Sequence, residues 1–228
     1  MNTAAVLDRL DTLIADRSIL RHPFYVAWQD GALTRAQLAT YATVYWPHVA
    51  AFPAYLASAV ETARDADATT RDALRRNLED ERGTPRPHAD LWLDFASGVG
   101  ADPGAVTAAP PHPAATRLVE TLEALTRDSV GEGLAGLYAY ESQQPEVSAT
   151  KQSGLRDRYG VTEPSTLAYF ALHAEMDLDH RRAEREALAR ALDAGADPEA
   201  VETATRQTLD AYWGLLDGVC DAAGIACA

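Results

Sequence analysis

Lysine, cysteine and long apolar runs are nearly absent from this sequence. Nineteen of its 20 basic side chains are arginines, and the exception is Lys151. Cys220 and Cys227 lack the spacing of a zinc motif, so they predict neither a disulfide framework nor a zinc site. No apolar run approaches the roughly 20 residues of a membrane-spanning helix, and the first residues do not resemble a signal peptide. We therefore expect a cytoplasmic protein that does not enter a membrane.

Positive charge is scarce as well. The sequence has 20 basic and 34 acidic residues, which gives a formal net charge of −14. Such a surface repels phosphate backbones, so the composition argues against nucleic acid as a partner. The remaining composition, 47% apolar and 24% charged, is that of a globular protein and excludes wholesale disorder. A chain of 228 residues is long enough to bury one sizeable core.

Apolar residues recur at helical spacing along almost the whole chain, and no alternating run predicts a strand. Thr34 and Gln37 form a capping-box pattern, and Pro145 should kink or break the helix that contains it. Residues 83–87 should stop one helix, and residues 101–113, with four prolines, should form the longest break. The expected helices span residues 6–21, 34–53, 68–80, 88–98, 114–127, 131–158, 164–195 and 198–222. The sequence therefore predicts one all-α domain over residues 1–228, a bundle of seven or eight helices.

One helix face combines metal-binding side chains. At about 100° per residue, His173, Asp177 and His180 fall within one narrow stripe, from which imidazole and carboxylate can chelate a metal together. A solvated face with hydrogen-bonded histidines is the alternative. The stripe continues the face of Tyr169 and does not include the arginine-rich surface that follows, which is formed by Arg181, Arg182, Glu184 and Arg185. This favours a buried site.

Two further places add acidic ligands. Glu81 ends a run of three acidic residues at the C-terminus of a helix, where the helix dipole disfavours negative charge. A metal cation bound by Glu81 and the nearby His88 would neutralise this charge. Glu141 follows a stretch of small residues suited to close packing, where a carboxylate needs a partner. Exposed acids in the first case and an arginine salt bridge in the second are the alternatives. Taken together, three carboxylates and three imidazoles form a ligand set for two iron or manganese ions, without the paired Glu-x-x-His motifs of ferritin-like proteins.

Several longer motifs identify a family. They are His22–Trp28, Tyr41–His48, Ala51–Leu56, His88–Trp92, Leu137–Gln143 and Tyr169–His180. With these motifs, nearly the whole chain resembles the heme-oxygenase-like diiron oxidases, specifically the folate-associated family of the chlamydial protein associating with death domains. It departs from that pattern at Arg82, where an acid is usual, and at Pro47.

The resemblance implies a p-aminobenzoate synthase that bypasses the usual chorismate route. The six residues above would bind two metal ions, iron and/or manganese, with O2 and an external reductant as co-substrates. The protein itself would be consumed, with Tyr25 as ring donor, Lys151 as amino donor, and Tyr41 and Tyr140 as radical relays. A homodimer is also implied. One independent point supports the amino donor: a guanidinium cannot replace a transferable primary amine, and this chain retains its single lysine at that position.

Other functions remain open at this point. A dimetal oxidase of the same scaffold could act catalytically on a small external substrate. A non-oxidative thiaminase-like or cofactor-binding protein could share the helical scaffold, although both cysteines lie in the tail, away from the motifs. The tyrosines could also be ordinary core residues whose hydroxyls are hydrogen-bonded.

Overall fold

The computed structural model describes residues 2–83 and 86–227, and the regular secondary structure in these ranges is entirely helical. Short 3-10 turns occur at Ile19–Arg21 and Ala63–Asp65. The eleven α-helices of these ranges are α1 (Thr3–Asp16), α2 (Pro23–Gln29), α3 (Arg35–Thr62), α4 (Ala68–Arg82), α5 (His88–Gly98), α6 (Pro103–Ala108), α7 (Pro113–Asp128), α8 (Val130–Glu141), α9 (Gln144–Asp157), α10 (Pro164–Asp193) and α11 (Pro198–Ala223).

The expected all-α class is confirmed, and the higher helix count has local causes. The short helix α2 is separate from α1, and the expected helix over residues 131–158 is divided into α8 and α9 just before Pro145. Proline is tolerated in the first turn of α9, because the amide hydrogen it lacks would have no partner there. The proline-rich segment 101–113 was expected to be irregular but contains α6. Asp102 caps this helix by accepting a hydrogen bond from the backbone N–H of Ala105 at 2.9 Å.

Helix ends follow the sequence signals elsewhere. The Thr34 hydroxyl accepts the N–H of Gln37 at 3.2 Å, and the Gln37 side chain accepts the N–H of Thr34 at 2.8 Å. This reciprocal pair is the expected capping box, and it starts α3. Helix α4 ends at Arg82, while residues 84 and 85 of the expected stop lie outside the described residues.

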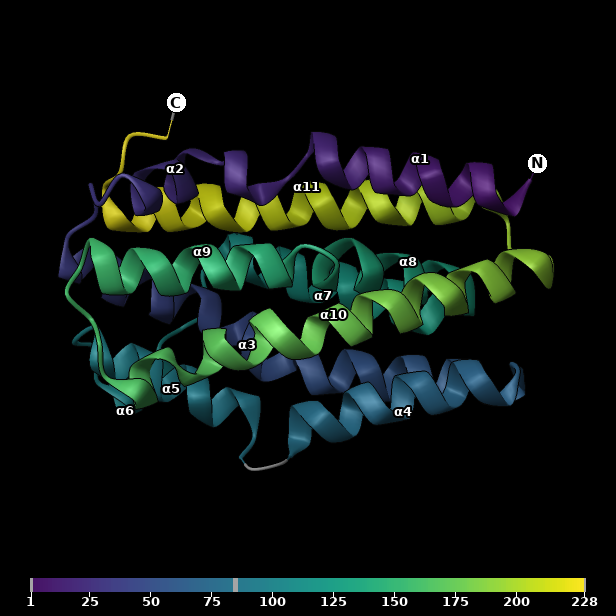
Figure 1. Ribbon diagram of the computed structural model, residues 1–228, viewed down its shortest axis with the longest axis horizontal. Helices are drawn as coiled ribbons and strands as arrows, with labels where there is room; N and C mark the ends of the chain where they lie inside the picture. The colour runs from purple at the N-terminus through teal and green to yellow at the C-terminus, as the bar shows by residue number, and fades with distance from the viewer. Residues whose placement is uncertain (1, 84–85, 228) are drawn as a thin grey trace.

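Helix α10 occupies a central position that brings distant segments together (Figure 1). It packs against α9, α5, α8 and α4, while α11 packs against α1, α7 and α8. The ends of α4 and α8 and the start of α5 therefore meet the middle of α10. No helix in the described ranges is both long enough and apolar enough to cross a membrane.

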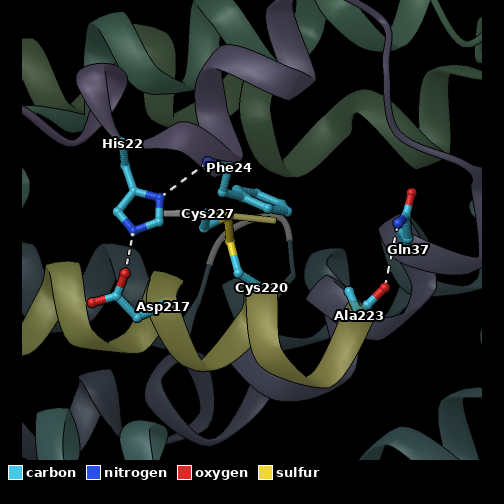
Figure 2. Close-up of a disulfide and its surroundings, with 7 residues drawn as sticks. All are labelled: His22, Phe24, Gln37, Asp217, Cys220, Ala223 and Cys227. Carbon is cyan, nitrogen blue, oxygen red and sulfur yellow. Dashed lines mark hydrogen bonds and ion pairs between the residues drawn. A yellow bond between two sulfur atoms is a disulfide. The ribbon is translucent and has the colours of Figure 1, made fainter. Parts of the chain in front are cut away.

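The two cysteines form a disulfide, which the sequence analysis did not expect (Figure 2). Gly224 follows the last residue of helix α11 as its C-terminal cap, and its left-handed backbone (φ 62°) reverses the chain. The N–H of Ile225 then donates to the carbonyl of Cys220 at 2.9 Å, which returns Cys227 to the helix. The beginning of α2 lies beside this bond. There, His22 accepts the N–H of Phe24 through Nδ1 and contacts Asp217 through Nε2 at 3.0 Å.

Candidate metal centre

Six buried side chains form two clusters around the middle of α10. In the first cluster, the ligand atoms of Glu81, His88 and His173 all lie within 4.8 Å of one another. In the second, the same holds for Glu141, Asp177 and His180. All six residues expected to bind metal are therefore brought into two groups of three.

The two clusters share one cavity. Its lining includes Glu81 and His173 from the first cluster and Glu141 and Asp177 from the second. Its free volume is about 10 Å³, which is room for roughly one water molecule. The cavity is therefore a suitable place for small ions, and it has little room for anything larger.

Histidine orientation decides what the first cluster can bind. His173 Nδ1 lies 2.7 Å from the carbonyl of Tyr169, to which it can only donate. In the neutral ring, the lone pair of Nε2 then faces the carboxylate of Glu81 at 3.6 Å. Two acceptors in this position need a proton or a cation between them.

The second cluster repeats the arrangement with the ring reversed. His180 Nε2 lies 3.1 Å from Asp80 Oδ2, whereas Nδ1 lies 3.2 Å from Asp177 Oδ1 and 3.5 Å from Glu141 Oε1. A carboxylate that holds the outer nitrogen while the inner one faces the ligands is the usual support of a metal-bound histidine.

The pKa shifts of these groups also indicate that the two clusters stabilise positive charge. Burial alone would lower the pKa of His173, but Asp177 and Glu81 outweigh it and raise that pKa to about 9. The pKa of His180 is likewise raised to about 11, because hydrogen bonds to Asp177 and Glu141 overcome burial. For Glu81, burial is outweighed by bonds to His173 and His88, and the pKa falls to about 2.

Unpartnered atoms complete the case that this set fits a metal. His88 Nε2 and Asp177 Oδ2 are buried without a hydrogen-bond partner in the described residues. A buried polar atom without a partner is costly, and coordination would satisfy it. Mixed imidazole and carboxylate ligands suit iron and manganese.

Three buried residues of the site were missed by the sequence analysis. Glu184 lies one turn after His180 on α10, and its pKa is raised well above its usual value by burial and by Glu141. It had been counted with the arginine-rich surface, although its spacing of four from His180 was a usable signal. Asn77 donates from Nδ2 to both oxygens of Glu141, at 3.1 and 2.9 Å. His48 lines the cavity, neither of its ring nitrogens has a hydrogen-bond partner among the described residues, and burial lowers its pKa to about 3.

The expected donors Tyr25 and Lys151 lie together in an aromatic pocket. The Lys151 side chain is buried, and its amine lies 5.3 Å from the ring centres of both Tyr25 and Tyr41. Tyr45, Trp92 and Phe170 surround it at 5.2 to 5.9 Å. No carboxylate in the described ranges forms an ion pair with this amine, and burial lowers its pKa to about 7.

The expected relay residues occupy different positions. Tyr140 lines the metal cavity, and its hydroxyl lies 3.0 Å from that of Tyr45. Tyr41 lies in the lysine pocket, with its hydroxyl 3.3 Å from that of Tyr25. Tyr140 therefore borders the candidate metal centre, whereas Tyr41 borders the candidate donors.

Comparison with known proteins identifies the family of this chain. Residues 39–213 match the family of iron-containing redox enzymes. The chain is 36% identical to a 4-aminobenzoate synthase of Nitrosomonas europaea, covering 96% of this chain and 92% of that protein. It is 38% identical to a 4-aminobenzoate synthase of Chlamydia trachomatis serovar D, covering 94% and 92%.

The fold also has solved counterparts. A domain with a heme oxygenase-like fold from Shewanella denitrificans superimposes with a TM-score of 0.75 at 18% identity, covering 97% of this chain and 93% of that one. At that identity the likeness concerns the fold alone. The match over residues 39–213 and the two relatives above go further, and the chain belongs to the family of iron-containing redox enzymes, with a heme-oxygenase-like fold.

Proposed function

We propose that this protein is an O2-dependent dimetal oxidase that makes p-aminobenzoate for folate biosynthesis, using the ring of Tyr25 and the amine of Lys151. The observation that carries the proposal is the buried amine of Lys151, which lies beside the Tyr25 ring and has no ion-pair partner in the part of the chain that the structure describes. An ordinary structural lysine would have a carboxylate partner, because burying an unpaired ammonium is costly. The names of the two relatives indicate the product.

The metal centre would contain two ions, iron and/or manganese, held by the two clusters described above. When bound, they supply O2 activation, with electrons from an external reductant. The carboxylates tolerate changes in metal charge, while the histidines are fixed by Tyr169 and Asp80. The small cavity and the surrounding aromatic rings keep water and bulk reductants out.

The chain's own residues then determine the chemistry at the donors. With a pKa near 7, Lys151 is about half unprotonated at neutral pH, and a neutral amine can act as a nucleophile. Tyr25 presents its ring to this amine. Tyr140, which lines the cavity, would be the first residue to be oxidised to a radical. Tyr41, whose hydroxyl contacts that of Tyr25, would be the second radical relay.

The remaining parts of the proposal rest on the family resemblance. We propose that residues 1–228 act as one domain in the cytoplasm, and that two copies form a homodimer. An oxidase that acts on an external substrate is less well supported, because a cavity with about 10 Å³ of accessible space has no room for one. A thiaminase-like function lacks a free cysteine, since Cys220 and Cys227 are bonded to each other.

The experiment is to label the protein and follow the label. Protein made with ring-labelled tyrosine is loaded with metal, then given reductant and O2, and p-aminobenzoate is analysed by mass spectrometry. We expect labelled product at no more than one molecule per chain, and little product from Lys151→Arg. Unlabelled product, or many turnovers on an added substrate, would contradict self-donation. Arg156→Lys, an exposed position on α9, is the matched control and should not change the yield.

A further inference from the structure

A third group of metal-binding side chains lies outside the core clusters, where the end of the chain meets the start of α2. One ring nitrogen of His22 and the sulfurs of Cys220 and Cys227 all lie within 4.8 Å of one another. His22 and Cys220 are buried, and Cys227 is half-buried. Figure 2 shows the His22 ring beside the disulfide. These side chains belong neither to the two metal clusters nor to the lysine pocket, so what they do is independent of the proposed function.

Backbone contacts hold the two cysteines close whether or not their sulfurs are bonded. Gly224 reverses the chain after α11, and the N–H of Ile225 donates to the carbonyl of Cys220 at 2.9 Å. Ile225 and Cys227 also pack against the hydrophobic core. Breaking the S–S bond removes none of these contacts. The reduced chain therefore presents two thiols next to His22.

The His22 ring has the orientation and the protonation state that a metal ligand needs. Its Nε2 lies 3.0 Å from Asp217 Oδ1, and a carboxylate only accepts, so Nε2 carries the proton. The lone pair is then on Nδ1, which accepts the N–H of Phe24 at 3.1 Å. Burial lowers the pKa of His22 and outweighs the opposite effect of Asp217, which favours the neutral ring. A carboxylate behind the outer nitrogen is the usual support of a metal-bound histidine.

The ligand types determine which ion fits. Thiolates favour zinc over manganese, and two cysteines with one histidine bind zinc with a fourth position left to water. Cys227 lies beyond the last helix, so its sulfur can move from bonding distance to the wider spacing of two metal ligands. Binding through Nδ1 displaces the N–H of Phe24, but this single capping hydrogen bond is weak beside a metal–ligand bond.

We propose that reduction of the Cys220–Cys227 disulfide creates a zinc site formed by the two sulfurs and His22 Nδ1. Two molecules of a small thiol supply two electrons and two protons, which convert the protein disulfide into two thiols, and they become a disulfide themselves. Zn2+ then binds the two sulfurs and displaces the two thiol protons. Asp217 is a positioning residue that holds the ring through Nε2. A reducing cytoplasm, the compartment proposed above, keeps cysteines as thiols and so favours the metal-binding form.

Cobalt is the probe for the first test, because a cobalt–thiolate bond gives a charge-transfer band in the near ultraviolet that carboxylate and imidazole ligands do not give. Wild-type protein is titrated with Co2+ after reduction by a phosphine, and again after oxidation of the cysteines. We expect the band, from one ion per chain, in the reduced protein alone. Cys227→Ser should lack it in both states, and Ala226→Ser, at the exposed neighbouring position, should match the wild type. No band in folded, reduced wild type at saturating Co2+ would overturn the proposal.

Displacement of the cobalt by Zn2+, followed in the same band, measures the zinc affinity of this site apart from the core clusters. His22→Asn removes the imidazole but keeps a side chain that can cap α2. This variant should bind zinc at least about 10-fold more weakly, since it lacks one ligand. An affinity equal to that of the wild type would show that His22 is not a ligand, and it would overturn the three-ligand site.

The role of Asp217 is tested in the same titration. Asp217→Asn should weaken zinc binding by about 10-fold, within the range for residues that support a metal ligand. Asp217→Glu, which restores the carboxylate, should recover most of this loss. Asp210→Asn, which removes another exposed acid of α11, is the control and should not change the affinity. Equal losses in Asp217→Asn and Asp210→Asn would mean that only surface charge matters, and the positioning role of Asp217 would be wrong.

Discussion

The candidate metal cavity and the lysine pocket lie in the same core but have opposite effects on the pKa of a basic side chain. In the cavity, carboxylates and imidazoles face one another, so the pKa of His173 is raised to about 9 despite burial. In the pocket, Lys151 faces aromatic rings, and burial lowers its pKa to about 7. The first region stabilises positive charge, and the second favours its loss. An oxidase that binds cations beside a nucleophilic amine needs both environments.

The largest effect should come from removing one charge from the cavity. Asp177→Asn keeps the shape of the side chain but removes a charged ligand that both histidines of α10 face. We expect loss of at least one metal ion per chain and a fall in product of more than about 100-fold, since even supporting residues of metal sites cost 10- to 100-fold. Metal analysis by mass spectrometry after gel filtration measures the first effect. Glu186→Gln, exposed on the same helix, should retain both ions, and full metal content in Asp177→Asn would contradict the assignment.

The opposite treatment of charge in the lysine pocket predicts a pH-dependent stability. The pKa of Lys151 is about 7 in the folded protein, against its ordinary value of 10.5 in an unfolded chain, so the unfolded chain binds more protons between these values. Wild-type stability should therefore rise with pH across this window, and the burial cost is full below pH 7. Lys151→Met should raise the free energy of unfolding by roughly 5 kcal/mol at pH 6, and by much less near pH 10.

Urea unfolding at the two pH values measures this difference. Arg156→Met, on the exposed side of the same helix, is the control and should show no such pH dependence. An equal effect of Lys151→Met at pH 6 and pH 10 would mean that the amine is not desolvated. Either way, the substitution should abolish p-aminobenzoate formation, because it removes the proposed amino donor.

The sequence predicted the cavity better than its surroundings, for a physical reason. His173, Asp177 and His180 share one helix, so their common face follows from helical periodicity alone. The position of Asn77 under Glu141 depends on how α4 packs against α8 and α10, which local spacing does not determine. The disulfide depends on the chain reversal at Gly224, which the spacing of the two cysteines does not reveal.

The smallest expected effect concerns Asn77, which supports the candidate metal ligand Glu141 without being a ligand itself. Asn77 donates to both oxygens of Glu141 and so fixes the direction of that carboxylate. Asn77→Ala should weaken the binding of the ion at the second cluster by about 10-fold, within the range for residues that support a metal ligand. Competition with a chelator measures this affinity, and Glu79→Ala, exposed on the same helix, is the control. Because the lysine pocket does not use Asn77, the pH dependence assigned to Lys151 should be unchanged in this variant. A change in that pH dependence would mean that the two regions are coupled through the core, and the contrast between them would then be one of degree.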